Sequence, residues 1–208
     1  MNIKWFGHSC FALSGNGVKL LTDPFDPATG YQAAYEKVDA VTVSHGHHDH
    51  SAADLVPGQP LVIKGPGQYN VGPVKITGIA AYHDSARGVR RGEITMYLFE
   101  MEDLRLLHAG DLGHYLYQDT VDALGRVDVL FLPVGGVYTI DAGVAAQVVR
   151  QLNPPLVLPM HYQTPAETSR LGELGDFTKR FPKVERRKEL EAKRASLPAE
   201  TTVMILEY

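Results

Sequence analysis

The densest group of metal-ligand residue types in the chain is the stretch VSHGHHDHSAADL, residues 43–55, which holds four of the nine histidines. His45 and His47 are two residues apart, so in an extended segment their rings project to one side and can reach one ion. Asp49 and His50 are adjacent and cannot share that geometry equally well, which suggests a second ion. Imidazole and carboxylate both suit zinc, at bond lengths of about 2.0–2.2 Å. The stretch therefore predicts a metal centre.

The alternative is a solvated, histidine-rich tract, but such a tract has no strand before it and no matching ligands after it. Here four predicted strands end at ligand-type residues: 39–44 at His45, 74–82 at His83, 104–110 at Asp111 and 155–160 at His161. Open α/β sheets place their sites at that edge. Taken singly, His83 and His161 could be ordinary strand-end residues and Asp111 a helix cap. Their joint order favours metal binding.

The rest of the pattern alternates short strands with helices. Strands are predicted over residues 2–6, 10–14, 18–23, 60–65, 94–100, 127–134 and 202–208, in addition to those above. Helices are predicted over 31–38, 115–124, 141–152, 173–181 and 185–195, with Asp141 as an N-cap. No linker, repeat or low-complexity tract interrupts the pattern. It indicates one α/β layered domain over residues 1–208.

The composition restricts the classes of partner. The 208 residues are 44% hydrophobic and 21% charged, enough for a packed core. A net charge of −4 and a pI of about 6.1 argue against binding to nucleic acid or an anionic membrane. No apolar run approaches the ~18 residues of a membrane span, no signal-peptide pattern opens the chain, and the single cysteine, Cys10, suits a reducing compartment. We expect a cytoplasmic protein with a small-molecule substrate. The sequence leaves open whether the protein forms a homo-oligomer.

The motif HGHHDH, a lone histidine after a strand, AGDLG and PMHY together resemble the metallo-β-lactamase fold superfamily of hydrolases. Within it, WFGHSCF, LTDPF, HAGDLGH and PVGGVYTID resemble small bacterial zinc-dependent hydrolases related to ascorbate-6-phosphate lactonase. The resemblance runs from Trp5 to Tyr162. It implies a four-layer αββα sandwich with the site at one edge, between the sheets.

The resemblance also implies the ligand set. One ion would be held by His45, His47 and His83, and a second by Asp49, His50 and His161, with Asp111 bridging and Asp23 orienting the histidine loop. The expected cofactors are two divalent ions. Zinc is the expected metal, with manganese or iron as alternatives. Two ions about 3.5–4 Å apart would hold a bridging hydroxide at neutral pH that attacks the substrate, and Asp49 would also orient that nucleophile.

The remaining histidines keep more than one interpretation. His8, in the motif GHS, is a candidate catalytic residue that contacts substrate or orients a ligand, or else it makes a structural hydrogen bond. His48 is expected to face solvent and His108 to face sideways on its strand. His114 could form part of the pocket wall, with a helix-capping role equally open.

The segment HDSARGVRRGE places Arg87, Arg90 and Arg91 just after His83. They could hold a phosphate or carboxylate by bidentate contacts, or they could be surface arginines on a solvated turn. In PVGGVYTID, two glycines let the backbone approach the pocket, where Tyr138 could offer a hydroxyl; the alternative is a tight turn.

We therefore predict hydrolysis of a small, anionic ester, lactone or phosphodiester. One alternative is a nuclease acting on RNA ends, like the tRNA 3′-processing endonucleases that share the HGHHDH motif. The net negative charge of the chain weighs against this alternative. A second is iron redox chemistry, which in the flavo-diiron proteins uses a glutamate where this chain has His47. A third is a non-catalytic metal-binding protein, which predicts a fully coordinated site.

Overall fold

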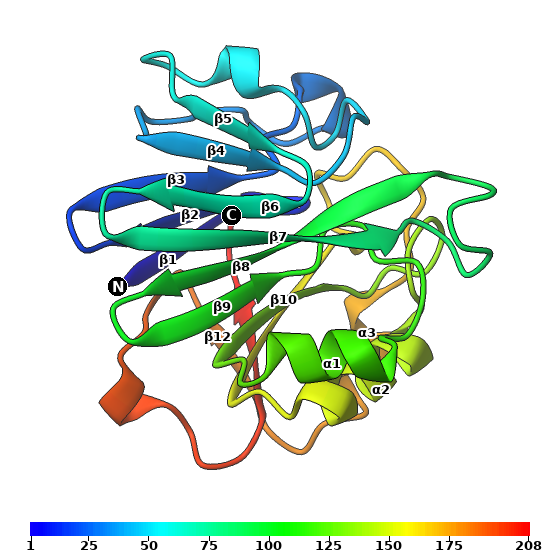
Figure 1. The fold of residues 1–208 in the computed structure, drawn as a ribbon. Coiled ribbons are helices and arrows are strands. Elements are labelled where there is room, and N and C mark those ends of the chain that lie inside the picture. Colours follow the sequence, from blue (N-terminus) through cyan, green and yellow to red (C-terminus); the bar gives the residue numbers. More distant parts are fainter.

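The computed structural model describes residues 1–208, which form two β-sheets packed face to face (Figure 1). Across the smaller sheet the strands are β13 (Glu189–Glu191), β1 (Asn2–Gly7), β2 (Cys10–Gly15), β3 (Val18–Thr22), β4 (Ala40–Val43) and β5 (Leu61–Lys64). Across the larger they are β12 (Val184–Arg187), β14 (Thr202–Leu206), β11 (Leu156–Met160), β10 (Val129–Pro133), β9 (Leu104–His108), β8 (Glu93–Met101), β7 (Val74–Tyr82) and β6 (Gly67–Val71).

The core lies between the sheets, where strands such as β1 and β7 direct alternate residues and the central strands β10, β11 and β14 are buried throughout. On β2, Phe11 and Leu13 belong to a cluster of 48 buried residues that includes side chains of both sheets. Cys10, on the opposite face of β2, belongs instead to a cluster of nine on the outer side of the smaller sheet. The two periodic faces of one strand thus fill two separate layers.

Three α-helices, α1 (Gln118–Leu124), α2 (Ala142–Leu152) and α3 (Leu174–Thr178), gather on the outer side of the larger sheet (Figure 1). Asp141 caps α2 as predicted, its carboxylate accepting from the backbone N–H groups of Gly143 and Val144. Short 3₁₀ helices lie at Pro27–Thr29, Ala53–Leu55 and Arg194–Ser196. The predicted α/β class with two sheets is confirmed, and none of the helices is long and apolar enough to cross a membrane.

The helix predicted over residues 31–38 is absent, and this segment is irregular. Its apolar residues at helical spacing, Tyr31, Tyr35 and Val38, are buried against the smaller sheet from an irregular backbone. The Tyr35 hydroxyl donates to the carbonyl of Phe25 and accepts from its N–H, both at 2.8 Å. Tertiary contacts therefore override a short helical pattern, and the outer layer here is built from loop and 3₁₀ turns.

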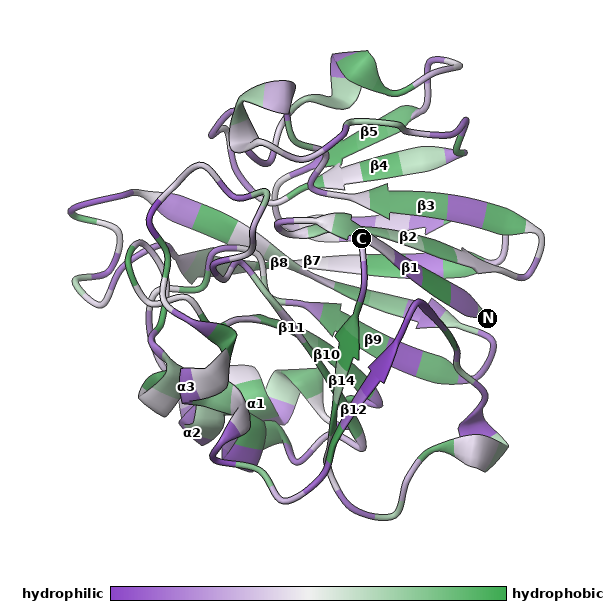
Figure 2. Ribbon diagram, turned by 180° about the vertical axis from the view of Figure 1, so that it is seen from behind, coloured by the Kyte–Doolittle hydropathy of each residue, from purple (hydrophilic) through white to green (hydrophobic).

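The helix predicted over residues 185–195 is also wrong, because this segment forms β12 and β13. β12 runs parallel to β14, with Val184 opposite Val203, and β13 pairs with β1 of the other sheet. Figure 2 shows β12 as a hydrophilic edge strand beside the hydrophobic β14. Backbone hydrogen bonds to two sheet edges decide the structure of this charged stretch, and they are invisible in local sequence.

Most strands that matter for the site end at the same edge. β3 and β4 are parallel in the smaller sheet, and β9, β10 and β11 are parallel in the larger. β7 runs in the direction of β9, since both are antiparallel to β8, and β1 runs in the direction of β3, since both are antiparallel to β2. The residues that follow these strands are thereby brought together.

Candidate metal centre

The carboxylate of Asp111, just after β9, lies at the centre of a ring of imidazoles. Its Oδ1 is 3.2 Å from His50 Nε2, and its Oδ2 is 3.3 Å from His83 Nε2 and 3.4 Å from His161 Nε2. His45 Nε2 lies 3.9 Å from Oδ2. These side chains follow four different strands, so the convergence predicted from the strand ends is present.

Two donor groups that share no residue adjoin Asp111, and a third set, Asp23, His45 and His50, overlaps both. His45, His47 and His83 form one group, in which the ligand atoms lie within 4.8 Å of one another. Asp49, His50 and His161 belong to the other, by the same measure. The structure therefore places six of the seven predicted ligands in the two sets that the resemblance implies, with Asp111 beside members of both, and it adds His8 to the second.

The residues present fit a bound cation. His50 Nε2 and Asp111 Oδ1 are buried without a hydrogen-bond partner, and such orphaned atoms cost about 1–3 kcal/mol each when nothing satisfies them. Their separation of 3.2 Å is close to that of two ligands on one tetrahedral ion, about 3.4 Å for bonds of about 2.1 Å. Nitrogen and carboxylate oxygen donors are a set that zinc binds readily.

Asp23, which follows β3, contacts the histidine loop directly. Its carboxylate accepts from His50 Nδ1 at 2.8 Å, from Ser44 N at 2.7 Å and from Ser44 Oγ at 2.5 Å. Because the Ser44 hydroxyl donates its hydrogen to Asp23, its oxygen accepts from His45 Nδ1, at 2.9 Å. One buried carboxylate thus holds Nδ1 of His50 directly and that of His45 through Ser44, which leaves Nε2 of each ring on the side of Asp111.

The electrostatics keep His45 neutral and Asp111 ionised, both states that can bind a metal, whereas His50 has to lose a proton to do so. Burial, with His50 nearby, lowers the pKa of His45 to about 3, so this ring is neutral at neutral pH. Burial opposes ionisation of Asp111, but His161 and His50 hold its pKa well below the usual range. Burial likewise opposes charge on His50, yet Asp111 and Asp23 raise its pKa well above normal in the metal-free protein.

Backbone strain is concentrated at this edge. His8, Asp23 and His161 have φ values of 49°, 38° and 52°, in the left-handed region that non-glycine residues seldom occupy. A Cβ on Gly113 would overlap the backbone of His83 and its successor, so the AGDLG loop can approach only with glycine there. Tertiary contacts hold these conformations, and strain of this kind clusters at functional sites.

A cavity of about 740 Å³ opens beside the donors, with His47, Asp49 and His161 among the residues that line it. Arg90, Arg91 and Tyr138 line the same cavity, and the Arg91 guanidinium lies 5.3 Å from the Tyr138 ring centroid. Both arginines are exposed, and neither guanidinium makes an ion pair. Two unpaired positive charges thus border the metal-ligand cluster.

Asp84 shapes the loop that carries these arginines. Its Oδ1 accepts from the N–H groups of Ala86 and Gly88, and its Oδ2 from those of Arg90 and Arg91, at 2.7–3.1 Å. Burial disfavours the charged form, but the four N–H groups keep the pKa of Asp84 below its usual value. None of the sequence motifs indicates Asp84, although an aspartate before a glycine-containing loop is a signal for such a turn.

Two predicted substrate residues lie elsewhere. Arg87 and His114 line a different hollow, beside Tyr82, and not the cavity at the donors. His114 Nε2 accepts from Tyr82 N at 3.2 Å and its Nδ1 donates to Tyr115 O at 2.7 Å. Both ring nitrogens of His114 are therefore used in supporting the backbone.

The other histidines are also placed. His48 is exposed, as predicted, and contacts Asp26 at 3.1 Å. His108 does not face sideways but is fully buried, where its Nε2 donates to Ser9 O at 2.8 Å. His8 is 2% exposed and does not line the cavity, so direct contact with substrate there is not supported.

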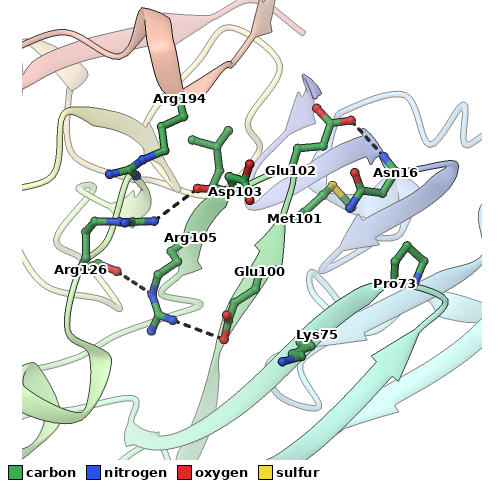
Figure 3. A pocket seen from close by; sticks show the side chains of 11 residues that line it. Asn16, Pro73, Lys75, Glu100, Met101, Glu102, Asp103, Arg105, Arg126 and Arg194 are labelled. Atoms are coloured by element: carbon green, nitrogen blue, oxygen red, sulfur yellow. Dashed lines mark hydrogen bonds and ion pairs between the residues drawn. The ribbon is translucent and has the colours of Figure 1, made fainter.

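A second hollow lies at the far end of the larger sheet, beside the turn between β8 and β9 (Figure 3). Its arginines already have partners: Arg105 Nη1 is 3.3 Å from Glu100 Oε1, and Arg105 Nε donates to Arg126 O at 2.8 Å. Arg194 Nη1 pairs with the buried Asp128 at 2.9 Å. This hollow has no unpaired guanidinium and no cluster of metal-ligand side chains.

The chain is similar to known proteins over nearly its full length. Residues 2–161 match the family model of the beta-lactamase superfamily domain. UPF0173 metal-dependent hydrolases from Pyrococcus horikoshii and Thermoplasma acidophilum are 31% and 30% identical to it, over 79% of this chain and 85% and 84% of theirs. A Thermotoga maritima crystal structure, whose description proposes a Zn-dependent hydrolase of the metallo-beta-lactamase superfamily, is 40% identical with a TM-score of 0.84, covering 99% of this chain and 98% of that one.

Proposed function

The chain belongs to the metallo-β-lactamase superfamily of metal-dependent hydrolases, and from this premise we propose that it hydrolyses a small, anionic ester, lactone or phosphodiester. The observation that carries the proposal is the pairing of a metal-ligand cluster with two free guanidinium groups in one cavity. The cluster supplies the means of hydrolysis, and the arginines select the charge of the substrate. The proposed partner is accordingly a small molecule.

Two divalent ions, zinc first, would occupy the cluster, one at His45, His47 and His83 and one at Asp49, His50 and His161, with Asp111 between them. Such ions, when bound, polarise the scissile group and lower the pKa of bound water toward neutrality.

The chain's own residues supply orientation and charge. The side chain of Asp49 is one-quarter exposed and lines the cavity, so its carboxylate can accept a hydrogen bond from an attacking water. Burial disfavours its ionised form, but His8 and His50 keep its pKa far below the usual range. Asp49 is therefore an acceptor at any working pH near neutrality.

Arg90 and Arg91 are proposed to hold the anionic group of the substrate. A guanidinium presents a fixed fork of donors that matches carboxylate and phosphate, and these two have no competing carboxylate in the chain. Arg91 is kept over the face of Tyr138, whose hydroxyl is a further donor at the rim.

The test is an assay of chelator-treated protein reconstituted separately with zinc, manganese or iron(II). The panel contains lactones, phosphodiesters and phosphorylated sugars, each with a neutral analogue of matched size. We expect metal-dependent hydrolysis that favours the anionic members. Absence of bound metal after reconstitution, or hydrolysis that survives chelation, would exclude the proposal.

A further inference from the structure

His8 sits on the turn between β1 and β2, held to both sheets by its backbone. Its carbonyl accepts from Trp5 Nε1 at 3.1 Å and from His161 N at 3.2 Å. These bonds fix the left-handed φ of 49° and place the ring 4.4 Å, between centroids, from that of His161. The ring is 2% exposed and does not line the cavity.

The Nδ1 atom of His8 has a dedicated partner in Glu167. Nδ1 donates to Glu167 Oε2 at 2.8 Å, and the Glu167 side chain is 1% exposed. The other oxygen, Oε1, accepts from Ser169 N at 2.9 Å, which fixes the carboxylate. This arrangement repeats that of Asp23 on His50, in which a buried carboxylate holds Nδ1 and leaves Nε2 directed inward.

The Nε2 atom of His8 is buried and has no hydrogen-bond partner. It lies 3.4 Å from Asp49 Oδ2, and it is within 4.8 Å of the ligand atoms of His50 and His161. A hydrogen bond to Asp49 at this distance is longer than the usual 2.9–3.0 Å, and it requires hydrogens on both ring nitrogens, of which a bound ion would displace the one on Nε2. The observed 3.4 Å between His8 Nε2 and Asp49 Oδ2 matches the spacing expected for two ligand atoms on one tetrahedral ion with bonds of about 2.1 Å.

We propose that His8 is a further ligand of the ion held by Asp49, His50 and His161, and that Glu167 is the residue that orients it. The inference rests on the metal binding proposed above. A histidine whose second nitrogen is held by a carboxylate is the usual form of a metal-binding imidazole.

The consequence is an asymmetric pair of sites. With His8, the second site has four protein donors besides Asp111, and it lies mainly on the buried side of the cluster. The first site has three, of which His47 is exposed; two donors of each site line the cavity, so the asymmetry lies in the number of donors and not in access to the cavity. Closed sites hold an ion structurally and open ones bind substrate. We therefore assign substrate contact to the ion at His45, His47 and His83.

The test compares zinc binding to wild type, His8→Asn and the control His48→Asn. Asparagine tolerates the left-handed backbone and can still donate to Glu167, but it cannot reach the ion. His48 is exposed and outside both groups, so its replacement makes the same chemical change without removing a donor. Binding is measured by calorimetry and by elemental analysis after dialysis, and cobalt(II) absorption reports coordination.

Wild type and His48→Asn should bind two ions alike. His8→Asn should bind one of the two at least roughly tenfold more weakly, with a changed cobalt spectrum, and Glu167→Gln should weaken the same ion less. Two ions bound by His8→Asn with wild-type affinity and spectrum would overturn this inference alone. No ion bound by wild type would overturn the proposed function with it.

A second measurement needs no variant and applies even if His8→Asn fails to fold by circular dichroism. In a crystal structure of zinc-loaded wild type, with zinc located by anomalous scattering, His8 Nε2 should lie at about 2.1 Å from an ion. A distance beyond about 3 Å, with the other ligands in place, would reject His8 as a ligand.

Discussion

His50 Nδ1 lies 2.8 Å from Asp23 Oδ2, and both side chains are completely buried. The pair joins the end of β3 to the histidine loop after β4. Through Ser44, the same carboxylate also determines the orientation of His45, so one aspartate prepares a donor in each of the two groups. A residue outside both predicted ligand sets is therefore expected to influence how tightly the ions bind.

Asp23→Asn should lower the affinity for both ions, by roughly 10–100-fold for the one at His50. An amide oxygen is a weaker acceptor than a carboxylate oxygen. The amide also has only one acceptor atom for the three groups that donate to Asp23, which are Ser44 N, Ser44 Oγ and His50 Nδ1. Zinc calorimetry measures the change, with Asp39→Asn as the control, because Asp39 also accepts a backbone N–H (Lys19) but lies away from the site. Equal affinities in Asp23→Asn and wild type would show that the contact is merely structural.

Asp111→Ala should remove most of the metal from at least one group and abolish hydrolysis, because this carboxylate faces donors of both groups. Elemental analysis after dialysis gives the metal content, and the substrate panel gives the activity. Hydrolysis of a phosphodiester or lactone by Asp111→Ala at the wild-type rate would place the active site elsewhere.

Arg90→Ala should raise KM for anionic substrates by about tenfold or more and leave neutral analogues nearly unchanged, because a hydrogen bond to a charged group contributes about 1.5–3 kcal/mol. Arg87→Ala is the matched control, since Arg87 belongs to the same loop but lines a different hollow. The same increase in KM for neutral analogues would argue against an anion site at Arg90.

Asp84→Ala should loosen the loop of residues 84–92 without touching the metal ligands. The N–H groups of Ala86, Gly88, Arg90 and Arg91 lose their acceptor, so their hydrogen exchange should become faster. KM for anionic substrates should rise as it does in Arg90→Ala, while zinc affinity stays at the wild-type value. Unchanged exchange at these four amides would mean that other contacts hold the loop.

The stabilising effect of zinc should grow as pH rises. Burial opposes charge on His50, but Asp111 and Asp23 raise its folded-state pKa. Its contribution in the metal-free protein is thus fully present below the unfolded pKa of about 6.5 and is lost as pH rises through the folded pKa. Metal binding displaces protons and therefore strengthens over the same range.

Urea unfolding of zinc-loaded and chelated protein between about pH 6 and 9 measures this difference, with the slope of the transition checked for two-state behaviour. The free energy of unfolding of the chelated protein should fall as pH rises, and its gap from the loaded protein should widen. A gap that is independent of pH would show that His50 does not carry the charge assigned to it.

The local sequence was sufficient for most strands, for the helix capped by Asp141 and for the main donors of the site. The reason is that these features are short-range: β7 alternates buried residues with more exposed ones, β4 and β11 are short runs of buried residues, and the end of such a pattern marks the end of the strand. His45, His83 and His161 each follow such an end, and parallel strands bring their ends to one edge.

Tertiary structure decided what depends on distant partners. Residues 185–195 have helical composition but pair as strands with β14 and β1, because hydrogen bonds to open sheet edges outweigh helical propensity. Glu167 is separated from His8 by 159 positions, so no spacing rule could connect them. The sequence determined which side chains could bind metal, whereas the folded chain decided which atom of each faces the ions, because ring orientation is set by hydrogen bonds between segments far apart in the chain.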